Sequence, residues 1–308
     1  MKKTLSAPDQ WLPSRSTRPA EEPFAFSQTR KNHIKRLEAL RESKVLVYIE
    51  RQQAPQDVLR YVFEHLRSAH RQTHRRLDLV LFGTRPGQLQ DLELALQWMA
   101  LCREHAREVS VIIPSQGTGL ATLLAIGADS VLMHPLATLG QLSAAEAMMP
   151  SRHFQSWLET LGSVESAVTQ DAWHQFIAQC GPQNLAQAHR THAQLKSGLL
   201  ALIQGRVRPQ DTDNQPLWEL LDDPTAPLAR PMDRRLARHR LALPTQALDA
   251  DTETALWDLF CAYEHPLNLL QNPTPKVKRP TASVVIESME ACHVHRGQWQ
   301  ALNNTPLM

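Results

Sequence analysis

The sequence has no long apolar run and no large excess of charge of either sign. No stretch approaches the about 20 consecutive apolar residues that a membrane-spanning helix needs. The basic start, Met1-Lys2-Lys3, is followed by Asp9 and Pro13 instead of the apolar core of a signal peptide. The 33 Lys and Arg against 31 Asp and Glu give a net charge of +2, far from the strongly basic balance of a nucleic-acid binder. We therefore expect a soluble cytoplasmic protein with no membrane association.

Cysteine is scarce, and it does not occur in metal-binding or disulfide patterns. The four cysteines are widely spaced and include no CxxC pair, which favours reduced thiols (Cys102, Cys180, Cys261, Cys292). His293 and His295 share one face of a predicted strand, but with Cys292 beside them they fall short of a zinc ligand set. His189 and His192 have helical spacing without a nearby carboxylate. We expect no metal and no cofactor.

What the sequence does contain is an alternation of strands and helices. Four runs rich in apolar and β-branched residues predict strands at 44–50, 77–83, 109–114 and 130–135. Between them, apolar residues at helical spacing predict helices at 55–70, 91–105 and 120–126. The nearly all-apolar strand at 77–83 indicates a parallel sheet that is covered on both faces. The alternation predicts a layered α/β fold built from β-α-β units.

Changes in composition divide the chain into three segments. Residues 1–43 are a basic, proline-containing arm and a first helix, and residues 44–270 are the α/β domain with helical additions. Residues 271–308 are a proline- and lysine-rich linker followed by a C-terminal hairpin or tail. The additions are predicted helices at 151–162, 171–180, 184–205, 233–241 and 251–265. The apolar face of the first suits either an interface or a core (Phe154, Trp157, Leu158, Leu161).

One stretch, "VSVIIPSQGTGLATLLAIGADSVLMHP" at 109–135, reads as strand, glycine-containing turn, helix and strand. The stretches "VYIERQQ", "LDLVLFGTRPG" and "SVLMHPLATLGQLS" around it, and "ARPMDRRLARHRLALPTQALDADTETALWDLFCAYEHP" later, keep a matching order and spacing. Together they resemble the serine dehydrogenase proteinase family, a branch of the Clp-protease/crotonase superfamily related to signal peptide peptidase A. The resemblance covers about two-thirds of the chain. It implies a Clp/crotonase-like α/β fold, a homo-oligomer and a serine nucleophile at the start of the helix.

The residues that the family's chemistry needs are missing here. Aligned on "ATLLAIGAD", Gly119 stands where the resemblance places the serine. The family's Thr-Pro-Gly-Gly oxyanion segment corresponds to Gly83-Thr84-Arg85-Pro86-Gly87, and proline has no N–H to donate. The segment after the helix has His134-Pro135 in place of Asp-Pro, and the later His and Asp are replaced by apolar residues. A nucleophile, base and oxyanion hole act as a unit. The sequence therefore predicts a catalytically inactive subunit that acts as a scaffold or as a binding module for a protein partner.

Two other functions stay open on the sequence. An active hydrolase could use Ser115 as a relocated nucleophile, with Thr118 as a further hydroxyl and His134 as the base; the alternative roles are capping of the helix by Ser115 and packing of His134 at a strand end. A nucleic-acid or acidic partner could bind Arg234 and Arg238, which lie close together on a predicted helix.

The same turn could also hold an anionic ligand. A glycine turn that opens a helix presents backbone N–H groups and the positive end of the helix dipole. The candidate ligand residues are Gly117, Thr118, Gly119, Arg85 and Gly87, with Arg85 approaching from the neighbouring strand end.

Overall fold

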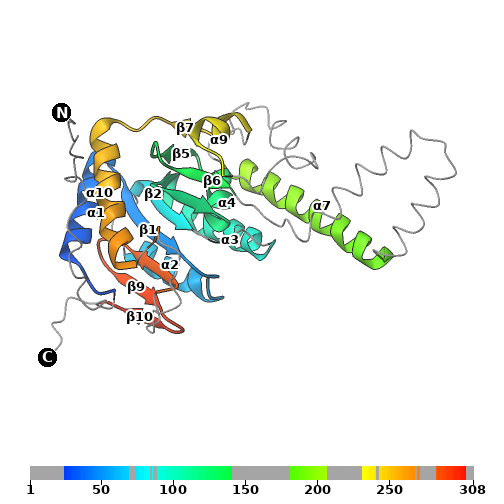
Figure 1. Cartoon of the computed structure of the whole chain (residues 1–308), viewed down its shortest axis with the longest axis horizontal. Coiled ribbons are helices and arrows are strands. Elements are labelled where there is room, and N and C mark those ends of the chain that lie inside the picture. The colour runs from blue at the N-terminus through cyan, green and yellow to red at the C-terminus, as the bar shows by residue number, and fades with distance from the viewer. Residues whose placement is uncertain are drawn as a thin grey trace, which may run out of the picture.

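The computed structural model describes residues 24–68, 74–83, 85, 89–140, 181–206, 231–240, 243–267, 269–270 and 282–302. Their strands form a twisted sheet in the order β10-β9-β8-β1-β2-β3-β5-β7 (Figure 1). The parallel strands are β1 (Lys44–Glu50), β2 (His74–Gly83), β3 (Ala106–Ile113), β5 (Ser130–Met133) and β7 (Thr245–Gln246). The sheet therefore has a parallel centre, as the sequence predicts.

Three helices connect these parallel strands: α2 (Val58–Ser68), α3 (Leu89–His105) and α4 (Leu120–Gly127). They pack over the same sheet face, and α7 (Pro182–Gln204) packs against α3 and α4. Because β1, β2, β3 and β5 are neighbours in chain order, the successive crossovers run in one direction and share one hand. The predicted β-α-β units and layered α/β class are confirmed.

The opposite face of the sheet is covered by α1 (Gln28–Arg41) and α10 (Ala250–Leu267), which lie side by side (Figure 1). Strand side chains alternate between the two cores. In β2, Leu79 and Leu81 join the core under α2, α3 and α4, while Val80 and Phe82 join the core under α1 and α10. This two-sided burial is why the strands have unbroken apolar runs.

Three antiparallel strands extend the sheet beyond β1: β8 (Val284–Glu287), β9 (Cys292–His295) and β10 (Trp299–Ala301). Val284–Glu287 pairs with Val47–Glu50, so the expected C-terminal hairpin is an integral part of the main sheet. The sequence boundary at residue 270 thus does not coincide with an end of the sheet. Helix α1, placed with the N-terminal arm by the sequence, likewise covers part of the core.

Two short strands form a layer beside the carboxyl ends of the main strands. β4 (Gln116–Thr118) pairs in parallel with β6 (Thr138–Gly140), and Gly117 of β4 also pairs with Gly83 of β2. Leu139 of β6 bridges to Met232, just before α9 (Arg234–Arg240). The helices predicted at 151–162 and 171–180, including the apolar face of the first, lie outside the described residues. Within the described ranges, none of the helices is both long and apolar enough to span a bilayer.

Candidate functional site

The turn between β4 and α4 is the centre of the candidate site. Gly119 is the N-cap of α4, and its carbonyl accepts hydrogen bonds from the N–H groups of Thr122 (3.1 Å) and Leu123 (3.3 Å). Its backbone has φ 57° and ψ −120°, a conformation that a residue with a side chain adopts only under strain. In α/β-hydrolases a sharp strand-to-helix turn of this kind exposes the nucleophile. Here the residue at its apex has no side chain.

Thr118, the other hydroxyl of the turn, is engaged by the backbone. Its Oγ1 donates to the carbonyl oxygens of Gly83 and Arg85, each at 2.8 Å. One hydroxyl proton is thus shared between two carbonyls, which fastens the turn to the end of β2. The structure therefore gives Thr118 a positioning role.

Gly117 is required for packing. A Cβ atom at this position would lie 2.8 Å from Leu139 Cδ2 and 3.0 Å from Ile113 Cδ1. Both neighbours are buried apolar side chains, so a side chain at this position would force Leu139 of β6 and Ile113 of β3 to shift. The expected ligand role of Gly117 stays a prediction, and Gly87, another expected ligand residue, lies outside the described residues.

Ser115 and His134 are not brought together as a nucleophile and base. The His134 ring stacks on Trp257 of α10, with centroids 4.8 Å apart, on the sheet face opposite α4. Its Nδ1 accepts the Leu136 N–H at 3.2 Å, and no hydrogen bond joins the ring to Ser115 among the described contacts. The alternative role expected for Ser115 is also wrong: α4 is capped by Gly119 without a side-chain hydrogen bond, because β4 separates Ser115 from the helix. The expected packing of His134 at a strand end is confirmed.

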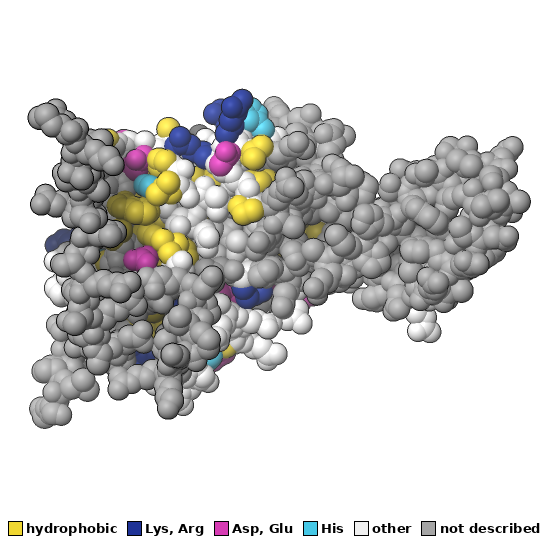
Figure 2. Space-filling model, viewed as in Figure 1, with side chains coloured by type: hydrophobic (Ala, Val, Ile, Leu, Met, Phe, Trp, Pro, Cys, Tyr) yellow, Lys and Arg dark blue, Asp and Glu magenta, His cyan; other side chains and the backbone are white. Residues whose placement is uncertain are grey.

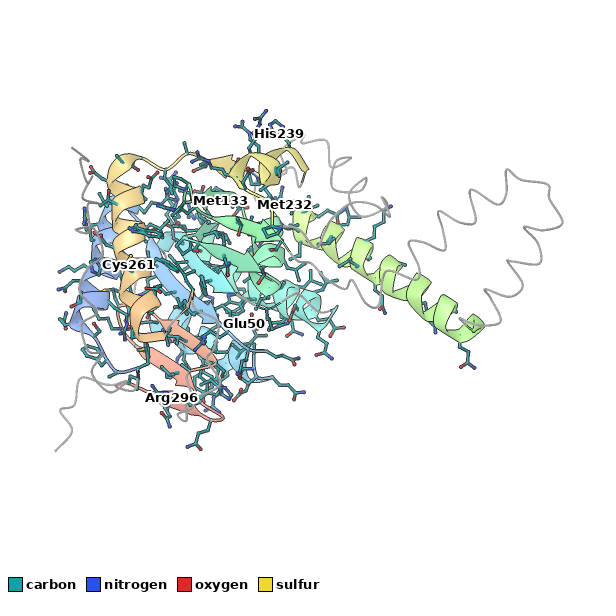
Figure 3. The ribbon with its side chains drawn as sticks, viewed as in Figure 1. Glu50, Met133, Met232, His239, Cys261 and Arg296 are labelled. Carbon is teal, nitrogen blue, oxygen red and sulfur yellow. The ribbon has the colours of Figure 1, made fainter. Side chains whose placement is uncertain are left out.

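Arg85 belongs to a buried cluster of charges that the sequence does not predict. Its guanidinium donates to Glu50 Oε1 (2.9 Å) at the end of β1 and to Asp91 Oδ1 (2.5 Å) in the first turn of α3. Figure 3 labels Glu50. Two carboxylates neutralise one guanidinium, so Arg85 is not arranged to hold an anion at the turn. The sequence shows only that Glu50 and Arg85 each stand at the end of an apolar segment. This pattern does not reveal that the two side chains meet.

Burial perturbs the acid in this cluster. Desolvation raises the pKa of Glu50 from 4.5 to about 7, because it outweighs the opposing effect of Arg85, and the charge of Asp91 adds to the increase. Tyr48, on the same face of β1, is fully buried, and burial raises the pKa of its phenol. A carboxyl that titrates near neutrality can exchange a proton, but no nucleophile or imidazole contacts it in the described part of the chain.

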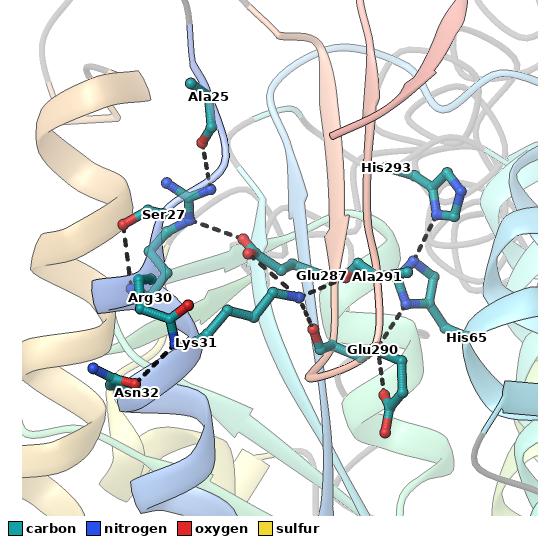
Figure 4. A network of polar contacts seen from close by, with 12 residues as sticks. Ala25, Ser27, Arg30, Lys31, Asn32, His65, Glu287, Glu290, Ala291 and His293 are labelled. Atoms are coloured by element: carbon teal, nitrogen blue, oxygen red, sulfur yellow. Dashed lines mark hydrogen bonds and ion pairs between the residues drawn. The ribbon is translucent and has the colours of Figure 1, made fainter. Parts of the chain in front are cut away.

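A second polar network joins α1, α2 and the β8–β9 turn (Figure 4). Ser288 Oγ donates to Glu290 Oε2 (2.9 Å) and lies 2.8 Å from His65 Nδ1, and His65 Nε2 lies 2.9 Å from His293 Nδ1. Burial lowers the pKa of His65 to about 3, so this imidazole is neutral. The Ser288 hydroxyl donates to the Glu290 carboxylate, so its proton is not directed at the His65 ring.

The structure gives other contacts to the histidines and the cysteine considered as metal ligands. Ser288 is fully buried, His293 contacts His65, and His295 Nδ1 lies 2.7 Å from Ser283 Oγ. Cys292 points into the other core, beneath α1 and α10. Across the described ranges, no group of three or more His, Cys, Asp or Glu is placed to hold a metal ion. The side chains of His189 and His192 lie outside the described residues.

Arg234 and Arg238 lie on α9, at the edge of the molecule. His239 of the same helix is labelled in Figure 3. Both arginine side chains are exposed, and neither forms an ion pair with a described residue. They are therefore accessible to a partner.

Comparisons with known proteins add little to this geometry. The sequence matches no protein-family model and no curated protein. Among solved structures, it aligns with a candidate enoyl-CoA hydratase of Mycobacterium avium paratuberculosis K-10 at 13% identity, covering 73% of this chain and 94% of the other. The TM-score is 0.23. A superposition at that TM-score does not establish a shared fold, so the described architecture is a layered α/β fold assigned from its own sheet and helices.

Proposed function

We propose that this chain is a catalytically inactive, serine-hydrolase-like subunit that acts as an oligomeric scaffold or a protein-binding module. The observation that carries the proposal is Gly119: a strand-to-helix turn of the kind that exposes a nucleophile, with φ 57° and ψ −120°, holds a residue that has none. The proposal takes the fold to be of the Clp/crotonase type, as the sequence resemblance implies. Retention of the turn without its nucleophile favours a structural or binding role.

The other groups near the turn support the same reading. The Thr118 hydroxyl is directed to two backbone carbonyls, and the Arg85 guanidinium is held between Glu50 and Asp91. His134 stacks on Trp257 on the opposite face of the sheet from α4. General-base catalysis requires the base within hydrogen-bond reach of the proton that it abstracts. No imidazole among the described residues meets this requirement at Ser115 or Thr118.

A serine-reactive fluorophosphonate probe tests the proposal. The wild-type chain, Ser115→Ala and Thr118→Val should all remain unlabelled beyond the level of heat-unfolded protein. Labelling of the folded wild type that is lost in Ser115→Ala would show that the chain is a hydrolase with a relocated nucleophile. Thr118→Val serves as the matched control because it removes the neighbouring hydroxyl and leaves Ser115 in place.

A further inference from the structure

One partly exposed surface combines apolar area with charges of both signs that form no ion pair with a described residue. It lies where β5 ends and α9 and α10 begin, and we call it the β5–α10 surface (His134, Leu136, Arg234, Leu248, Glu253, Trp257). Figure 2 shows hydrophobic, cationic, anionic and histidine side chains adjoining one another over this end of the sheet. A mixed surface of this kind is typical of a protein contact.

The apolar part of the surface is continuous with the core. Trp257 and Leu248 are only partly buried and pack on the core beneath α10, and Trp257 also stacks on His134. Next to His134, Leu136 is 65% exposed, the largest exposure among the large apolar side chains of the described residues. Covering this leucine and the tryptophan edge would remove apolar area from water without any change of fold.

Charged residues of both signs lie around His134 on this surface. Glu253 lies one helical turn before Trp257 on α10, and Trp257 stacks on His134, so Glu253 faces the same end of the sheet. Arg234 begins α9, which packs on β7 beside β5. Within the described part of the chain neither forms an ion pair. Glu253 is half-buried, and the nearby Asp249 and Asp251 are exposed. A purely anionic partner would be repelled by the acidic start of α10. A partner surface that also carries one positive and one negative charge can pair with both Arg234 and Glu253.

We infer that the β5–α10 surface binds a second copy of this chain. In a two-fold contact each residue i meets residue j of the partner, and j meets i, so one surface with both charges is complementary to itself. Arg234 of each copy then pairs with Glu253 of the other, and the two Leu136 side chains are covered. The inference rests on the proposed scaffold role and locates the contact on which an oligomer would depend.

Sedimentation equilibrium of the full chain tests the inference through two charge reversals. Arg234→Glu and Glu253→Arg should each raise the dissociation constant of the dimer at least about tenfold, because each creates two like-charge contacts. An equimolar mixture of the two variants should dimerise as tightly as wild type, since every contact is again between opposite charges. Leu136→Ser should also weaken the dimer, whereas Leu270→Ser, at a side chain 52% exposed elsewhere, should not.

Three results would overturn the inference: a wild type that is monomeric at all concentrations, reversals that leave the mass unchanged, or variants that fail to pair in the mixture. A far-UV circular dichroism spectrum that matches wild type shows that a variant which no longer dimerises is still folded. The outcome is separable from the proposed inactivity. A monomer that resists fluorophosphonate would leave the inactive assignment intact and remove only this interface.

Discussion

The buried carboxyl of Glu50 gives a quantitative prediction about stability. Glu50 is 3% exposed at its side chain, and its Oε1 accepts hydrogen bonds from Arg85 and from the Ala54 N–H at 3.0 Å. Glu50→Gln keeps an oxygen that can accept both bonds but removes the charge. The variant therefore isolates the cost of ionising this side chain from the packing around it.

The direction of the pH dependence of stability follows from the pKa of Glu50. The folded protein holds the Glu50 proton more tightly than the unfolded chain does, because burial raises the pKa from 4.5 to about 7. The free energy of unfolding should therefore fall as the pH rises through this window, where the folded state binds more protons. At about 1.36 kcal/mol per pH unit, the loss attributable to Glu50 is roughly 3 kcal/mol when complete. The advantage of Glu50→Gln over wild type should be small near pH 5 and should grow to about that amount at pH 8.

Urea denaturation at pH 5, 6, 7 and 8, followed by tryptophan fluorescence, measures this difference. Glu108→Gln is the control, because Glu108 forms a surface ion pair with Arg76 at 3.2 Å and should contribute little at any pH. Parallel pH profiles for wild type and Glu50→Gln would refute the account of Glu50. A Glu50→Gln variant that is less stable than wild type at pH 8 would show instead that the ion pair with Arg85 outweighs desolvation.

Three further substitutions should each lower the free energy of unfolding measured in urea. Gly119→Ala should cost about 1–3 kcal/mol because its backbone conformation strains any side chain, and Gly117→Ala should cost about 1–3 kcal/mol by overpacking the β4 contact. Gly205→Ala is their control: it lies in the right-handed helical region with its nearest neighbours at 3.5 Å, and a cost as large as theirs would contradict both explanations. Tyr263→Phe should cost about 1–3 kcal/mol, since it removes the 2.7 Å hydrogen bond to the buried Glu287; an unchanged midpoint would show that this bond adds nothing.

The sequence predicts the parallel centre of the fold well because its signals are local. Lys44–Glu50 is a strand with the predicted bounds, and the predicted helix at 120–126 is α4, Leu120–Gly127. Unbroken apolar runs indicated strands that are covered on both faces, as they are. The place of the C-terminal hairpin was not predictable in this way. Pairing of β8 with β1 joins residues more than 200 positions apart, and nothing in either strand's own pattern specifies the partner.

The candidate site was predicted only in part. The absent side chain at Gly119 follows from the sequence alone, but its backbone conformation does not. Capping by Ser115 was wrong because the six residues after β3 include a short strand, which the sequence reads as a single turn. The Glu50–Arg85–Asp91 cluster escaped prediction because its members come from β1, the segment after β2, and α3. Only the parallel sheet brings these three elements to one edge.

Intact-mass measurement after exposure to a fluorophosphonate tests the central claim most directly. The account predicts no adduct on the folded wild-type chain, because Gly119 supplies no nucleophile and no imidazole contacts Ser115 or Thr118 in the described structure. A single stoichiometric adduct that maps to Ser115, within the peptide 109–135, would contradict it and identify the chain as an active hydrolase.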